Sequence, residues 1–183
     1  SNVFQGILFS SIECVTAPNE MLRLWIHETN RVYRDKLADL KDVETFDKSQ
    51  KDIYKKTFDD IPEAEVFINP LIFCHFAKGI GEPKYMPIPS WDNLNKILVD
   101  ALKGHNELNA AMDLVLFEGA MSHICKISRI LESPRGNALL IGVGGSGTQS
   151  LSRLASYISS MEVFQITLSK GYGIQELKAD LSV

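Results

Sequence analysis

The 183-residue sequence has little of what marks secreted, membrane-spanning or nucleic-acid-binding proteins. Its three cysteines, Cys14, Cys74 and Cys125, stand far apart, which excludes a CxxC zinc site, argues against a disulfide framework and predicts buried free thiols. No apolar run reaches the length of a signal peptide or a membrane span. The net charge of −4 gives no basic stripe for nucleic acid or an acidic membrane. We therefore expect a cytosolic protein whose partners include neither.

Helical patterns dominate the first part of the sequence. Residues 20–39 place apolar side chains at three- and four-residue spacings with charges on the other face, which predicts an amphipathic helix capped by Asn19. Residues 41–56 form a polar stretch that we expect to be helical in part. Prolines and glycines crowd residues 66–89, and they predict connecting structure with a domain boundary at residues 82–89.

Two more helices are expected in the middle of the sequence. The first covers residues 90–102, with Ser90 as its N-cap and Gly104 as its stop signal. The second covers residues 106–131 and is stopped by Pro134, because the residue before a proline disfavours helical geometry. These helices would lead directly into the glycine-rich part of the chain.

A βαβ unit is the clearest local pattern. Residues 137–141 read as a short apolar strand, residues 142–147 as a glycine-rich loop, and residues 163–168 as a second strand. The helix between them, residues 149–160, carries its apolar side chains on one face: Leu151, Leu154, Ala155 and Ile158. Such a unit implies parallel strands and a right-handed crossover. Two parallel strands cannot form a covered sheet alone, so we expect a segment of a longer chain, as the missing initial Met also suggests.

The glycine-rich loop has the spacing of a nucleotide-binding P-loop, with glycines at positions 142 and 147. Glycine permits the backbone conformations that turn N–H groups toward phosphate oxygens, and the following helix adds its positive end. The motif GxxxxGK[ST] then uses Lys for the β- and γ-phosphates and a hydroxyl for Mg²⁺. Here Thr148 replaces the Lys and Gln149 replaces the hydroxyl residue, while Ser150 comes one position late. Nucleotide binding is expected to be weak or absent, and the place of Mg²⁺ stays open.

Other interpretations of these motifs are weaker. A glycine-rich turn without a ligand remains possible for residues 142–147, whereas a Rossmann site lacks the acidic residue that should follow the second strand. His27 and Glu28 begin an HExxH pattern, but Arg31 replaces the second histidine, which excludes a zinc-protease site.

Several longer segments resemble axonemal dynein heavy chains, of the outer-arm β type above all. Around the glycine loop these are LESPRGNALLIGVGGSG at 131–147, QSLSRLA at 149–155, VFQITL at 163–168 and KGYG at 170–173; upstream they are NVFQG at 2–6, RLWIHE at 23–28, RVYRDKL at 31–37, FCHFA at 73–77 and PKY at 83–85. The resemblance covers essentially the whole chain. It implies an α/β fold in which a helical AAA+ lid subdomain precedes the first part of a truncated P-loop AAA+ α/β subdomain.

The same resemblance implies a division into three parts. Residues 1–83 correspond to the helical lid of the third AAA+ module, residues 84–136 to connecting and N-terminal helices of the fourth, and residues 137–183 to its P-loop start. The parent would be an ATP-driven, minus-end-directed microtubule motor of the ciliary or flagellar axoneme, a cytoplasmic and cytoskeletal location. Its partners would be its remaining AAA+ modules, microtubules, intermediate and light chains, and other axonemal heavy chains.

The resemblance also assigns a nucleotide site. ATP or ADP would meet Val115, Leu116 and Phe117, the segment that packs on adenine, and the loop with the first helical turn, namely Gly142, Val143, Gly144, Gly145, Ser146, Gly147, Thr148, Gln149 and Ser150. Gln149 fits the family, whereas Thr148 departs from its usual Lys. We expect a regulatory site in a motor ring, with no catalytic residue in this chain. A free-standing P-loop regulatory protein and a scaffold with a vestigial loop are the alternatives.

Overall fold

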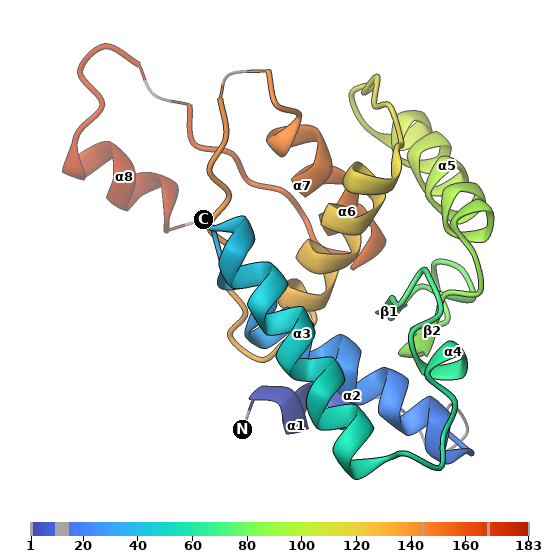
Figure 1. The fold of residues 1–183 in the computed structure, drawn as a ribbon. Helices are drawn as coiled ribbons and strands as arrows, with labels where there is room; N and C mark the ends of the chain where they lie inside the picture. Colours follow the sequence, from blue (N-terminus) through green and yellow to red (C-terminus); the bar gives the residue numbers. More distant parts are fainter. Residues whose placement is uncertain (1, 10–14, 144, 168, 183) are drawn as a thin grey trace.

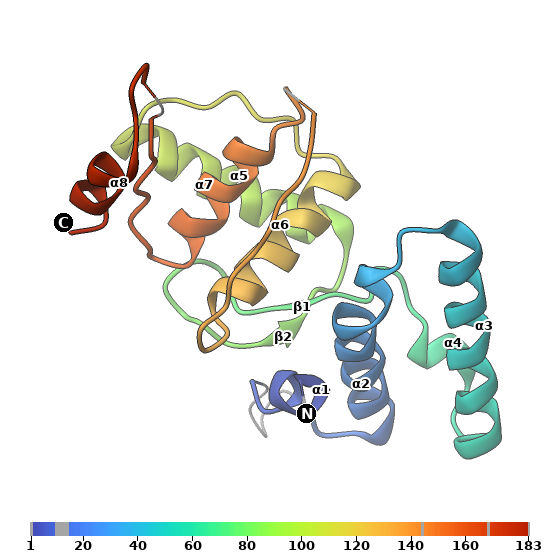
Figure 2. The same cartoon turned by 90° about the vertical axis from the view of Figure 1, so that its left-hand side faces the viewer.

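The computed structural model describes residues 2–9, 15–143, 145–167 and 169–182 (Figure 1). Its elements in chain order are α1 (Asn2–Ile7), α2 (Pro18–Val32), the 3₁₀ turn η2 (Arg34–Lys36), α3 (Leu40–Thr57), α4 (Glu63–Val66), β1 (Phe73–Cys74), β2 (Met86–Pro87), α5 (Trp91–Leu108), α6 (Glu118–Leu131), α7 (Thr148–Ile158) and α8 (Ile174–Asp180). Figures 1 and 2 show α1–α4 as one group and α5–α7 as another, with α8 apart from both.

The first group is organised around α2 and α3. The α2 helix begins two residues before the predicted start at residue 20, because Ala17 is the N-cap and Pro18 is the first helical residue. The prediction of Asn19 as the cap is therefore wrong. The carboxylate of Glu20 accepts hydrogen bonds from the Thr16 and Ala17 amides, at 2.8 and 3.2 Å, and so holds the start of the helix. The α3 helix covers the whole polar stretch and is capped by Asp39, which accepts from the Lys41 amide at 2.8 Å.

A short antiparallel strand pair connects the two groups. Phe73 pairs with Pro87 and Cys74 with Met86. The sequence predicted only connecting structure here, since two-residue strands leave no periodicity to detect. Phe73 of β1 is buried in a small cluster with Leu24 of α2 and Tyr85.

The helices α5 and α6 differ from the two predicted in this region. Ser90 caps α5 as expected, accepting from the Asn93 amide at 3.1 Å. Gly104 does not stop the helix, which continues to Leu108. A Cβ at Gly104 would lie 2.7 Å from the Tyr157 hydroxyl oxygen, so the glycine accommodates α7 instead. The single helix predicted over residues 106–131 is also wrong, because residues 109–117 are not helical.

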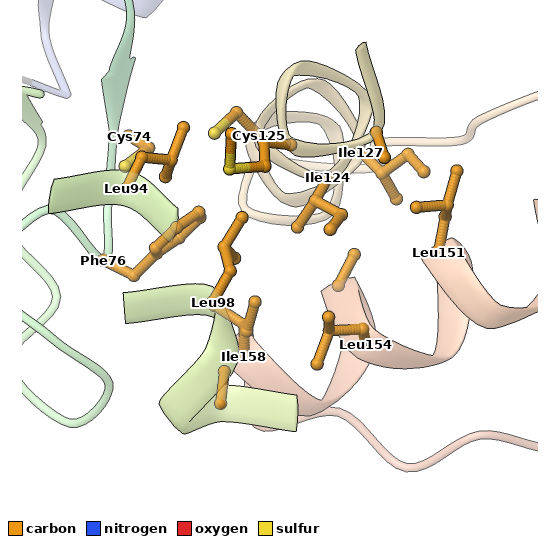
Figure 3. Close-up of a cluster of buried hydrophobic side chains, with 14 of the residues drawn as sticks. Cys74, Phe76, Leu94, Leu98, Ile124, Cys125, Ile127, Leu151, Leu154 and Ile158 are labelled. Atoms are coloured by element: carbon orange, nitrogen blue, oxygen red, sulfur yellow. The ribbon is translucent and has the colours of Figure 1, made fainter. Parts of the chain in front are cut away.

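The main core lies among β1, α5, α6 and α7 (Figure 3). The α7 helix starts one residue before the predicted start, and its buried side chains are the four that the sequence predicted: Leu151, Leu154, Ala155 and Ile158. They pack toward Ile124 and Ile127 of α6 and toward Leu98 of α5. The glycine-rich loop is therefore followed by a helix that is firmly packed on α6.

The two predicted parallel strands are not formed. Within the described parts of residues 137–143 and 161–167 the backbone makes no ladder hydrogen bonds, and Leu168 lies outside the described residues. Their apolar side chains stay exposed, Leu139 and Ile141 at 85% and 87%. Parallel strands are stable in sheets that are covered on both faces, and the described residues offer these segments neither neighbouring strands nor covering helices.

Candidate functional site

Two glycines of the glycine-rich loop have the left-handed backbone that P-loops use. Gly145 and Gly147 adopt positive φ angles of 83° and 76°, which residues with a Cβ rarely tolerate. Gly142 has another role: a Cβ there would collide with the hydroxyl of Ser146, so the absence of a side chain lets the loop close on itself. The Ser146 amide closes the turn by donating to the Val143 carbonyl at 3.1 Å. Gly144 lies outside the described residues.

The α7 helix begins directly at the loop. Gly147 is its N-cap and supplies no side-chain acceptor, and the first turn contains no acidic residue. Nothing in this turn therefore competes with an anion for the positive end of the helix. Thr148 and Gln149 are the first two helical residues, with Ser150 following. Position 148 supplies no ammonium for a phosphate, and position 149 lacks a hydroxyl for Mg²⁺.

The segment assigned to adenine lies beside α6. Phe117 is the N-cap of α6, and the side chains of Phe117 and Val115 are exposed, while Leu116 is half-buried. The carbonyl of Leu116 accepts from the Asn95 side-chain amide at 3.3 Å, which ties the segment to α5. In both views this segment and the glycine loop lie at the same end of the α6–α7 pair (Figures 1 and 2). The base-packing role of these three residues stays a prediction.

A pocket of about 300 Å³ lies alongside the first turns of α7. Thr148, Gln149 and Ser152 form one wall, and Val163 and Phe164 form part of the other. Arg153 is the one cation on the described walls, and its guanidinium donates to Gln165 at 2.5 Å. The pocket lies between α7 and the two segments that were predicted to form strands.

A buried polar network joins α2 to α6, a connection that the sequence did not suggest. Glu28 of α2 has no exposed surface, and Arg129 of α6 donates to its carboxylate through Nε at 3.1 and 3.3 Å and through Nη2. The Tyr85 hydroxyl donates to the same carboxylate. His27 contacts Tyr85 through Nε2 at 3.0 Å and the Leu71 carbonyl through Nδ1 at 3.1 Å.

Burial controls the ionisation of this network. Burial, reinforced by the adjacent Glu28 carboxylate, raises the pKa of Tyr85 well above its ordinary value, so the phenol keeps its proton. Burial also lowers the pKa of His27 well below 6.5, because its imidazolium would have no water around it. Three nearby cations add to this effect: Arg31, Arg129 and Lys126.

A second ion pair, closer to solvent, joins α6 to the η2 turn that follows α2. Lys126 of α6 approaches Asp35 of η2 at 2.9 Å, and Asp35 also pairs with Arg31 at 2.8 Å. The two bases of α6 are three residues apart and share one helical face. The prediction that the charges of residues 20–39 face solvent is therefore wrong for Glu28. Its side chain is buried in a pair with Arg129, which lies 101 residues later in the sequence.

We expect Gly6→Ala to destabilise the contact between α1 and α2. A Cβ at Gly6 would collide with the Glu28 carboxylate and lie 2.7 Å from Nη2 of Arg129. Although Gly→Ala in a helix usually gains about 0.5–1 kcal/mol, overpacking here should cost about 1–3 kcal/mol. Hydrogen exchange of the α2 amides measures the loss. The control is Gly119→Ala in α6, where the added methyl meets only the exposed Phe117 ring; equal effects of the two changes would contradict the prediction.

Stability of the α2–α6 contact should fall on acidification. His27 has a lower pKa in the folded state than its ordinary value of 6.5, so the unfolded chain binds more protons below that pH. Its contribution is present above pH 6.5 and is lost as the pH falls, with a slope of at most about 1.4 kcal/mol per pH unit. Comparing α2 hydrogen exchange at pH 7.5 and 5.5, corrected for intrinsic rates, should show this loss. His27→Gln should reduce it and the exposed His123→Gln should not; a loss unchanged by His27→Gln contradicts the assignment.

Cys74, Cys125 and His123 belong neither to the glycine loop nor to the buried polar network. Cys74 and Cys125 are buried free thiols in the main core, as predicted, and Cys14 lies outside the described residues. His123 is exposed and contacts the Gly119 carbonyl at 2.8 Å. Among the described side chains no three of His, Cys, Asp and Glu are grouped to hold a metal ion. None of the described helices is long and apolar enough to cross a membrane.

Two family models match different parts of the chain. Residues 112–183 match the family model of the P-loop containing dynein motor region D4, and residues 1–68 match that of the AAA+ lid domain. The whole chain is 63% identical to dynein axonemal heavy chain 9 of Homo sapiens and 62% identical to the ciliary dynein beta chain of Tripneustes gratilla. Over 99% of the chain, it is 46% identical to the flagellar outer arm dynein alpha chain of Chlamydomonas reinhardtii.

The chain spans about 4% of the length of each of these relatives. Within that span the resemblance noted from the sequence is confirmed. The lid match covers α1–α4, and the D4 match covers α6, α7 and α8 but not α5. The chain belongs to the axonemal dynein heavy chain family.

Proposed function

We propose that the glycine loop is a degenerate nucleotide site in the AAA+ ring of an axonemal dynein motor, regulating the ring more than hydrolysing ATP. The observation that carries this proposal is a loop with intact phosphate-binding backbone and altered side chains. Gly142, Gly145 and Gly147 have the close approach or the positive φ that a phosphate loop uses. Thr148 and Gln149 replace the groups that hold the γ-phosphate and Mg²⁺.

The parent heavy chain would then be an ATP-driven, minus-end-directed microtubule motor in the ciliary or flagellar axoneme. The D4 match supports assigning residues 112–183 to the fourth module of its ring, and the lid match supports assigning the first helices to the preceding module. Its partners would be the other modules of the same heavy chain, microtubules, and intermediate and light chains. Hydrolysis that drives movement would take place at another module of the ring.

Photo-crosslinking with an azido-adenine nucleotide tests binding at this loop in the intact heavy chain, with the labelled peptides identified by mass spectrometry. Gly145→Val should abolish labelling near the loop, because φ of 83° is strained for valine and the N–H groups would turn away. Gly171→Val is a matched control: its φ is 100° and its surroundings are equally open, but it lies outside the loop. Labelling that survives Gly145→Val, or is absent from the parent, favours a scaffold with a vestigial loop.

A further inference from the structure

We call the first helical group, α1–α4 with η2, the lid group. Four charged side chains join it to α6, and we call them the clasp: Glu28, Asp35, Lys126 and Arg129. Both acids come from the lid group and both bases come from α6. The two pairs are complementary in charge, and the inner pair is shielded from solvent. Glu28 has no exposed surface, so loss of the Arg129 guanidinium would leave its carboxylate buried without a cation.

The protein around the inner pair holds it in one arrangement. The Arg129 guanidinium engages both carboxylate oxygens, and the Tyr85 hydroxyl donates to one of them. Gly6 of α1 approaches so closely that a side chain there would displace the carboxylate. An ion pair with this many fixed partners specifies a geometry as well as joining two elements.

The other side of α6 carries the helix of the glycine loop. Ile124 and Ile127 of α6 belong to the same buried cluster as Leu151 and Leu154 of α7 (Figure 3). Close-packed contacts of this kind transmit displacements, because side chains in a core have little free volume. The α7 helix begins at Thr148, immediately after the loop. A continuous path therefore runs from α2 through the clasp and α6 to the first turn of α7.

We propose that Arg129 is a positioning residue, through which the lid helix α2 sets the place of α6 and thereby the geometry of the glycine loop. The clasp makes α2, α6 and α7 move together, so that a displacement of the lid reaches the loop and nucleotide bound at the loop restrains the lid. The effect on nucleotide rests on the function proposed above. The positioning of α7 by Arg129 does not depend on it.

The test uses the intact heavy chain and two separate measurements. The first is hydrogen exchange, without nucleotide, of the α7 amides from Leu151 onward, which donate within the helix. The second is azido-nucleotide labelling near the loop. Arg129→Met should speed exchange of these α7 amides at least about tenfold, and Arg129→Lys, which keeps the charge but loses the two-pronged contact, should have a smaller effect. Arg34→Met is the matched control, since the Arg34 guanidinium makes a two-pronged contact with Asp47 that stays within the lid group and involves no clasp residue.

Unchanged exchange in α7 for both Arg129 variants would overturn the positioning role. If Arg129→Met fails to fold, the Lys variant carries the same test. Equal effects of Arg34→Met and Arg129→Met would also overturn it, since they would reflect the loss of any two-pronged guanidinium pair. In a parent that labels, reduced labelling by Arg129→Met with α7 exchange raised supports the whole path. A parent that does not label, but shows raised α7 exchange in Arg129→Met, supports the positioning role and contradicts only the nucleotide site.

Discussion

Thr148→Lys should raise the nucleotide affinity of the glycine loop about ten- to a hundredfold. The substitution restores an ammonium at the first residue of α7, where a P-loop lysine contacts the β- and γ-phosphates. A hydrogen bond to a charged group contributes about 1.5–3 kcal/mol, and about 1.4 kcal/mol corresponds to a tenfold change in affinity. Gly145 and Gly147 already have the positive φ angles that a phosphate loop uses. Azido-nucleotide titration of the intact heavy chain measures the change.

Gln149→Lys is the matched control for this prediction. It adds the same charge one residue later, on an exposed side chain that points about 100° away around the helix. We expect it to increase affinity only slightly, through general attraction of a polyanion that salt screens. Equal gains from both variants would mean that position 148 has no special geometry. No gain from either would indicate that the loop does not bind phosphate at all.

The sequence predicted well those elements whose signals are local. The buried face of α7 follows from apolar side chains at helical spacing, and the Ser90 cap from a hydroxyl before a helical run. The glycine loop was recognised because its spacing is fixed by backbone chemistry. In each case the interactions that decide the structure involve residues within one or two helical turns.

Predictions failed where a distant partner decides the structure. Gly104 in isolation predicts a helix end, but the glycine is explained by its close contact with Tyr157, 53 positions later in the sequence. The strands at 137–141 and 163–168 have the right composition, yet a strand exists only when another pairs with it. Glu28 looks like an exposed charge because nothing near it in the sequence reveals Arg129. Long-range charge pairs leave no periodic signal.

Arg129→Met should destabilise the contact between α2 and α6 by about 3–5 kcal/mol. The change leaves the Glu28 carboxylate without its cation, in a place where it has no exposed surface. The cost comes mainly from this uncompensated charge, not from the loss of an attractive pair, because bringing two ions out of water offsets most of their attraction. Hydrogen exchange of the α2 and α6 amides, compared with the parent, gives the change in opening free energy.

If the uncompensated charge destabilises Arg129→Met, replacing Glu28 as well should restore stability, whereas loss of a simple attraction would not be reversed. If the uncompensated charge dominates, the double change Glu28→Met with Arg129→Met should recover most of the stability lost by Arg129→Met alone, since two apolar chains of similar length then meet. In the double variant the Tyr85 hydroxyl loses Glu28 but keeps Nε2 of His27 at 3.0 Å as an acceptor, so little residual cost should remain. A double variant as unstable as Arg129→Met alone would show that the pair is strongly attractive, and that the clasp holds α6 by charge and not by geometry.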